Sequence, residues 1–159
     1  MTFKVIETDM ARHGPALAGV RRAVFIDEQG VPEELEWDEH DAVSLHWLAV
    51  LEDGCPVGCA RLLPDGHIGR MAVLPSWRGR GIGRALLDAA LARAQARGLR
   101  EVRLSAQLHA ADFYRRAGFT ACGDVYEEAG IPHLAMRKNL PAGNSTLKSQ
   151  SAYPYLIKS

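Results

Sequence analysis

The sequence predicts an α/β (α+β) fold in which helices cover a mixed β-sheet. Segments with period-two and helical hydrophobic patterns follow one another in the order β-α-β-β-β-α-β-α-β-β. Two turn sequences, Asp53-Gly54 and Pro64-Asp65-Gly66, indicate that three consecutive strands form hairpins. A β-α-β unit follows them, which adds a parallel pair to the sheet. The length of 159 residues gives room for one domain.

The first half of the chain is expected to contain four strands and one long helix. The strands are expected at residues 3–8, 46–52, 56–63 and 67–73. Residues 9–14 are expected to form a turn, and Pro15 suits the first turn of a helix that continues to about Gly30. One face of this helix carries the stripe Leu17, Val20, Arg21, Val24 and Phe25.

The second half alternates helices and strands up to residue 140. Residues 74–83 predict a loop, and residues 84–97 predict an amphipathic helix that Gly98 ends. A strand at 101–106, a short helix at 110–117 and strands at 119–127 and 133–138 follow. Composition changes at Pro141, so we expect a domain of residues 1–140. Residues 141–159 are expected to be a tail that is flexible or carried over from an expression vector.

Charge and cysteine content argue against several classes of protein. Lys and Arg number 19, and so do Asp and Glu, so the chain lacks the positive excess typical of nucleic-acid binding. No apolar run has the length of a membrane span or the form of a signal peptide. Cys55, Cys59 and Cys122 show neither disulfide-framework nor metal-ligand spacing. We expect a soluble, cytoplasmic protein without a metal, a nucleic-acid partner or a membrane partner.

Residues 27–41 form an acidic block without Lys or Arg. It contains eight acids, namely Asp27, Glu28, Glu33, Glu34, Glu36, Asp38, Glu39 and Asp41. One interpretation is a solvated loop. The other is a negative rim that attracts a cationic substrate.

A glycine-rich segment between a predicted strand and a predicted helix favours phosphate binding. In Arg78-Gly-Arg80-Gly-Ile-Gly83, alternating glycines leave backbone N–H groups accessible next to the positive end of a helix. The segment lacks the Gly-Lys-Ser/Thr ending of a Walker loop, and its glycine spacing differs from the dinucleotide-binding fingerprint. The segment is therefore expected to bind a pyrophosphate, but not as a Walker loop or a dinucleotide-binding loop does.

Two motifs resemble those of the GNAT acetyltransferases. Val73-x-Pro75-x-x-Arg78-Gly-x-Gly81-x-Gly83 is similar to the family's Q/R-x-x-G-x-G/A signature. Gln107-x-x-Ala-x-x-Phe-Tyr114-x-x-x-Gly118-Phe119 is similar to its N-x-x-A-x-x-L/F-Y-x-x-x-G-F segment, with Gln107 in place of the family's Asn. The segment from Phe25 to Asp41, followed by His46, resembles the ElaA-like branch. The resemblance covers nearly all of residues 1–140.

The resemblance implies the rest of the fold and a binding site for acetyl-CoA. It implies a mostly antiparallel sheet in which two parallel strands, residues 68–73 and 102–106, splay apart, with helices on both faces. Acetyl-CoA would lie in that opening as a co-substrate, without a metal. The implied binding groups are the backbone of Met71, Ala72 and Val73, the glycine loop Arg78, Gly79, Arg80, Gly81, Ile82, Gly83 and Arg84, the amide of Gln107, and Tyr114.

The implied chemistry is direct transfer of the acetyl group to a neutral amine. The N–H of Val73 would polarise the thioester carbonyl, and Tyr114 would protonate the leaving thiolate. An alkylammonium must first lose a proton, because its pKa is near ~10.4. Glu28 is the first candidate for the general base, followed by His133 and then His46, and water is the alternative.

The expected function is an N-acetyltransferase for a primary amine on a small molecule or a peptide. A catalytically inactive CoA-binding sensor or interaction module of the same fold is the alternative, because Gln107 departs from the family pattern. A nucleotide-dependent enzyme that uses the same glycine loop is the third hypothesis. The sheet edges also allow a homodimer.

Overall fold

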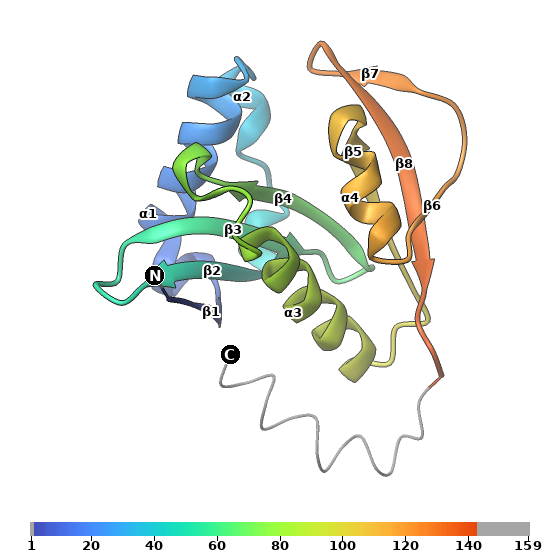
Figure 1. The fold of residues 1–159 in the computed structure, drawn as a ribbon, viewed down its shortest axis with the longest axis horizontal. Coiled ribbons are helices and arrows are strands. Elements are labelled where there is room, and N and C mark those ends of the chain that lie inside the picture. The colour runs from blue at the N-terminus through green and yellow to red at the C-terminus, as the bar shows by residue number, and fades with distance from the viewer. Residues whose placement is uncertain (1, 143–159) are drawn as a thin grey trace.

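The computed structural model describes residues 2–142, in which eight strands form one sheet (Figure 1). The order is β1-β2-β3-β4-β5-β8-β6, and β7 also pairs with β8. Each pair is antiparallel except β4 with β5. The strands are β1 (Phe3–Thr8), β2 (Leu45–Leu51), β3 (Pro56–Leu62), β4 (His67–Val73), β5 (Glu101–Gln107), β6 (Thr120–Ala121), β7 (Tyr126–Glu128) and β8 (Ile131–Asn139). The mixed, mostly antiparallel sheet is confirmed.

Helices cover both faces of this sheet, as expected. On one face, α1 and the π-helix η1 bury Leu17, Val20 and Val24 against β2, β3 and β4. On the other face, α3 packs on the sheet through side chains such as Leu86 and Leu87. The helical segments are α1 (Met10–Arg21), η1 (Arg22–Glu28), α2 (Glu33–Glu36), η2 (Asp41–Val43), η3 (Pro75–Trp77), α3 (Ile82–Ala96), η4 (Leu108–Ala110) and α4 (Ala111–Arg116).

The two parallel strands splay apart, as the resemblance implied. Pairing between β4 and β5 involves only His67 with Arg103 and Ile68 with Leu104. The register between β3 and β4 shifts beyond Gly69. Arg61 pairs with Gly69 and Cys59 pairs with Ala72, so two residues of β4 lie opposite one residue of β3, which is a β-bulge. Arg70 lies at this bulge with a left-handed φ of 48°. The bulge therefore marks the point at which β4 turns away from β5.

Several predicted boundaries were wrong. The turn expected at residues 9–14 is helical, because the side chain of Asp9 caps the helix by accepting from the N–H of Arg12. The helix is kinked at His13, two residues before Pro15, and continues as η1. At the other end, the strand expected over residues 119–127 is two short strands. Helix α3 begins at Ile82, two residues before the expected start.

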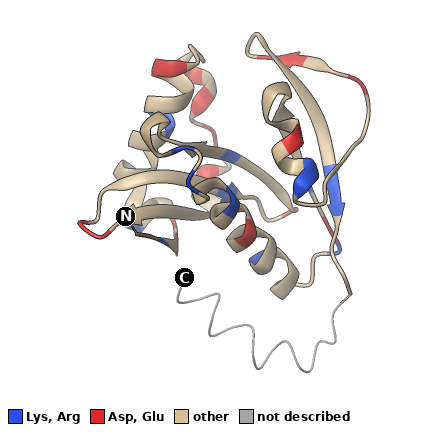
Figure 2. Ribbon diagram, viewed as in Figure 1, with Lys and Arg blue, Asp and Glu red and all other residues tan. Residues whose placement is uncertain are grey.

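The acidic block is only partly a solvated loop, which corrects that interpretation for three of its eight acids. Figure 2 shows acidic residues gathered along η1 and α2. Glu36 and Asp41 are buried and Asp38 is half-buried, whereas the other five acids are exposed. The residues with the exposed carboxylates are Asp27, Glu28, Glu33, Glu34 and Glu39.

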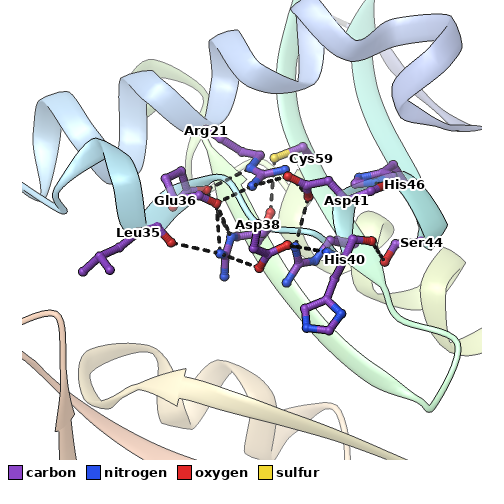
Figure 3. Close-up of polar contacts among 11 residues, drawn as sticks. Arg21, Leu35, Glu36, Asp38, His40, Asp41, Ser44, His46 and Cys59 are labelled. Atoms are coloured by element: carbon purple, nitrogen blue, oxygen red, sulfur yellow. Dashed lines mark hydrogen bonds and ion pairs between the residues drawn. The ribbon is translucent and has the colours of Figure 1, made fainter.

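Three arginines from other elements bind the three inward-facing acids (Figure 3). Arg21 of α1 donates to Glu36 at 2.8 Å and to Asp41 at 2.8 Å. Arg61 of β3 donates to Asp38 at 2.8 Å and to Asp41 at 3.0 Å. These five residues and Arg70 are called the arginine network below.

Arg70 ties the bulge of β4 to the acidic block. Its guanidinium lies 3.2 Å from the Glu36 carboxylate and 3.1 Å from that of Asp38, and it donates to the Glu36 carbonyl at 2.9 Å. Burial by itself would raise the pKa of Asp41, but hydrogen bonds and charges from Arg21 and Arg61 outweigh it and lower the pKa. Asp41 is therefore ionised and binds both Arg21 and Arg61.

Replacing Arg21 by Met is expected to lower the free energy of unfolding by about 3–5 kcal/mol, because two buried carboxylates, Glu36 and Asp41, each lose one of their two arginine partners. Arg22→Met is the matched control. Arg22 is the next residue, and its ion pair with Glu33 is exposed, so its loss is expected to cost about 1 kcal/mol or less. Urea unfolding of both variants measures the difference. Equal effects would contradict a structural role for the network.

Candidate active site

One cleft of about 1140 Å³ lies where β4 and β5 diverge. Its walls come from η1, β4, the β4–α3 loop, β5, α4 and the segment that leads into β8. Of the groups predicted to bind the cofactor, the lining includes Met71, Ala72, Val73, Arg78, Gly79, Gly81, Ile82, Gly83, Arg84, Gln107 and Tyr114. Arg80 is not part of the lining. Its guanidinium lies 4.8 Å from the ring centre of Trp77 instead.

The glycine loop opens α3 in a form suited to an anion. Gly79 and Gly81 have φ values of 76° and 85°, and a Cβ on either residue would point into open space. Gly81 is the N-cap of α3 and has no side-chain capping bond. The first N–H groups of a helix lack intrahelical acceptors, so those of α3 are available for a ligand at the positive end of a helix of 15 residues.

Glu28 and Arg78 form a bidentate ion pair inside this cleft. The two Nη atoms of Arg78 donate to the two carboxylate oxygens of Glu28 at 2.8 and 2.7 Å. The Nε atom of Arg78 donates to the carbonyl of Val73 at 2.9 Å. The hydrogen bond from Arg78 lowers the pKa of Glu28. In this arrangement Glu28 is a poor proton acceptor.

A second contact across the cleft joins Gln29 to Gln107. Each side-chain amide donates to the oxygen of the other, at 2.9 and 2.8 Å. The residue that replaces the family's Asn is therefore bonded to the end of η1. Sequence reasoning missed this pair, although Glu28 and Gln29 stand side by side in the ElaA-like segment.

Tyr114 reaches the cleft from α4 through an apolar surrounding. Its ring makes edge contacts with Phe113 and Phe119, with centroid distances of 5.0 and 5.9 Å. Its hydroxyl lies 3.6 Å from the Sδ atom of Met71. Burial raises the pKa of Tyr114 to about 12. The phenol is therefore protonated at neutral pH, and its hydroxyl can donate a hydrogen bond.

His133 lies on β8 opposite Gln107 of β5 and lines the cleft. Its Nδ1 atom is 2.7 Å from the carbonyl oxygen of Ile131. A carbonyl only accepts, so Nδ1 carries the proton and the lone pair of the neutral ring lies on Nε2. The ring stacks on Tyr126, whose hydroxyl is hydrogen-bonded to Ser105.

His46, the third candidate base, lies in a different part of the molecule. It is buried, its Nε2 atom is 2.9 Å from the carbonyl oxygen of Asp41, and it is not part of the cleft lining. Burial lowers its pKa. We therefore assign His46 a structural role beside the arginine network.

Comparisons with known proteins agree with this geometry. The Acetyltransferase (GNAT) domain family matches residues 8–140. The chain belongs to the GNAT acetyltransferase family. It is 33% identical to protein ElaA of Escherichia coli over 133 residues, which are 79% of this chain and 86% of ElaA. It is 37% identical over 124 residues to the uncharacterised N-acetyltransferase YjcF of Bacillus subtilis, covering 76% of this chain and 88% of that protein.

Solved structures of similar proteins show the same fold. The crystal structure of Escherichia coli ElaA has a TM-score of 0.76 and 30% sequence identity, covering 86% of this chain and 99% of that one. An acyl-CoA N-acyltransferase from Pseudomonas aeruginosa has a TM-score of 0.75 and 32% identity, with the same coverage. Membership of the family implies acyl transfer and use of an acyl-CoA. The uncapped start of α3 and the splayed strands fit such a ligand.

Neither a spanning helix nor a metal cluster is present in residues 2–142. None of the helices described there is long and apolar enough to cross a membrane. The same residues contain no group of three or more His, Cys, Asp or Glu side chains arranged to hold a metal ion.

Gly81→Ala is expected to weaken binding of acetyl-CoA about tenfold, which corresponds to about 1.4 kcal/mol. An alanine disfavours the positive φ and adds a methyl group to the open side of the loop. Gly98→Ala is the matched control, because Gly98 has a φ of 84°, equally open surroundings and a place at the opposite end of α3. Calorimetric titration measures both variants. Equal losses of affinity would count against the loop as the binding site.

Proposed function

We propose that this protein transfers an acetyl group from acetyl-CoA directly to a primary amine, and that residues 1–140 form the catalytic domain. The observation that supports the proposal most strongly is the meeting of three features in one cleft. These are the uncapped glycine-rich start of α3, the splayed strands β4 and β5, and the half-buried phenol of Tyr114. The first suits a pyrophosphate, the second leaves room for the pantetheine arm, and the third is a proton donor.

Acetyl-CoA supplies a thioester whose carbonyl carbon is attacked by the amine and whose sulfur leaves as a thiolate. We assign the backbone N–H of Val73 to the carbonyl oxygen. Arg78 restrains the same residue by bonding its carbonyl oxygen. Tyr114 is assigned as the acid that protonates the sulfur, since it lines the cleft and its hydroxyl lies beside Met71 of β4.

His133 is our choice for the general base. Glu28, the first candidate from the sequence, has both carboxylate oxygens bonded to Arg78 and a lowered pKa. His133 instead has one nitrogen fixed by the Ile131 carbonyl and the other unprotonated in the neutral ring. It lines the same cleft as Tyr114, which is the arrangement that separate acid and base groups require.

Calorimetric titration and a thiol-release assay test the proposal together. Acetyl-CoA is expected to bind more tightly than NADH or ATP, with free CoA as a further comparator. Thiol release is then measured with a panel of alkylamines, an arylamine and a peptide with a free amino terminus. Binding without turnover of any amine would favour the inactive CoA-binding module. Tighter binding of NADH or ATP would favour a nucleotide-dependent enzyme.

Tyr114→Phe is expected to lower kcat by about 10²-fold or more, as for loss of a general acid. The hydroxyl has a weak sulfur contact as its one hydrogen bond among the described residues, so the free energy of unfolding is expected to change by only about 1 kcal/mol. Steady-state kinetics and urea unfolding measure the two effects. Unchanged kcat in a folded variant would remove Tyr114 from the mechanism.

His133→Asn is expected to lower kcat/KM about 10²-fold at pH 7. The Asn amide can keep the bond to the Ile131 carbonyl but has no basic nitrogen. The loss of kcat/KM relative to the wild-type protein is expected to become smaller toward pH ~10, where the amine loses its proton without a base. His67→Asn is the control, since His67 also lines the cleft but its Nδ1 atom is bonded to Asp65. A deficit that is constant with pH would indicate a structural role for His133.

A further inference from the structure

The Glu28–Arg78 ion pair connects the two sides of the cleft. Glu28 is the last residue of η1 and lines the cleft. Arg78 is the first residue of the glycine loop, on the side of the predicted pyrophosphate. The next residue, Gln29, is bonded to Gln107 of β5. The end of η1 therefore contacts both the glycine loop that follows β4 and the end of β5.

This ion pair is exposed enough to exchange partners. The side chains of Arg78 and Glu28 are 44% and 37% exposed. An ion pair in such a position contributes about 0.2–1 kcal/mol. By contrast, the side chains of Arg21 and Glu36 are only 1% and 4% exposed. Arg78 is thus held in place weakly, next to free helix N–H groups that attract the same anion.

We propose that Glu28 and the pyrophosphate of acetyl-CoA compete for Arg78, and that Glu28, once released, binds the ammonium group of the acceptor. This inference rests on the proposed function. A diphosphate carries more negative charge than one carboxylate and also meets the N–H groups of α3, so it displaces Glu28 from Arg78. The freed carboxylate lines the same cleft. Its charge then favours a cationic amine.

The exchange couples the two substrates. Acetyl-CoA binding creates the carboxylate site for the amine, so acetyl-CoA binds first and raises the affinity for the amine. Linkage requires the amine to raise the affinity for acetyl-CoA by the same factor. Glu28 is then an acceptor-binding residue and His133 remains the base.

Glu28→Gln separates this exchange from a purely structural ion pair. Removing the competing charge is expected to tighten acetyl-CoA binding about threefold, in line with the strength of an exposed ion pair. Acetylpantetheine, which lacks the pyrophosphate, is expected to bind equally to both proteins. The KM of the alkylamine with the highest kcat/KM is expected to rise at least about fivefold, corresponding to about 1 kcal/mol.

Two further variants serve as controls. Asp27→Asn removes the neighbouring exposed charge, which lies outside the cleft lining, and is expected to change neither constant. In an Arg78→Gln background, Glu28→Gln is expected to have no further effect on acetyl-CoA binding. Weaker acetyl-CoA binding by Glu28→Gln would overturn the inference and show that the ion pair only supports the loop. Failure of wild-type protein to bind acetyl-CoA would instead overturn the proposed function.

Discussion

The arginine network is the constraint on which the site depends. Three guanidinium groups and three carboxylates meet between α1, the acidic block and strands β3 and β4. A buried charge without a partner costs several kcal/mol, so each member requires the others to stay in place. Because Arg70 belongs to both the network and the bulge, the position of the acidic block and the course of β4 are set together. The network stabilises one relative placement of these elements.

The course of β4 determines what the cleft can bind. After Ile68 the strand leaves β5, and Met71 to Val73 line the cleft. On the far side of the opening, η1 ends at Glu28. This segment is a π-helix, a form that often occurs at functional sites. The network fixes both elements that border the cleft here. Arg70 belongs to β4, and Arg21 ends the helix α1 that continues into η1. Stability and site geometry therefore share the same residues.

Local periodicity and turn sequences predicted the strands and helices of a mixed sheet, whereas the helices on both faces and the place of the glycine loop beside the splayed strands were implied by the family resemblance. The sequence did not predict which acids of the acidic block are buried or which arginines they contact. That block lacks Lys and Arg, and its partners in the arginine network are 15 to 34 residues away, in segments whose local patterns predict only an ordinary helix and ordinary strands. One signal was available: Arg21 stands on the apolar stripe of its helix, where a charged residue needs a buried partner. The bond between Gln29 and Gln107 joins residues 78 positions apart and left no local signal.

Exposure divides the arginines of this protein by what they can do. Arg21 and Arg61 have almost no exposed surface and two carboxylate partners each, so exchanging a partner would leave a buried charge unpaired. Arg78 has one carboxylate partner and a half-exposed guanidinium, and water can solvate both groups when the pair separates. Arginine therefore stabilises the fold where it is buried and can bind a ligand where it is partly exposed. The acids follow the same rule: Glu36 is held by the fold, whereas Glu28, eight residues earlier on the surface of the cleft, is available for exchange.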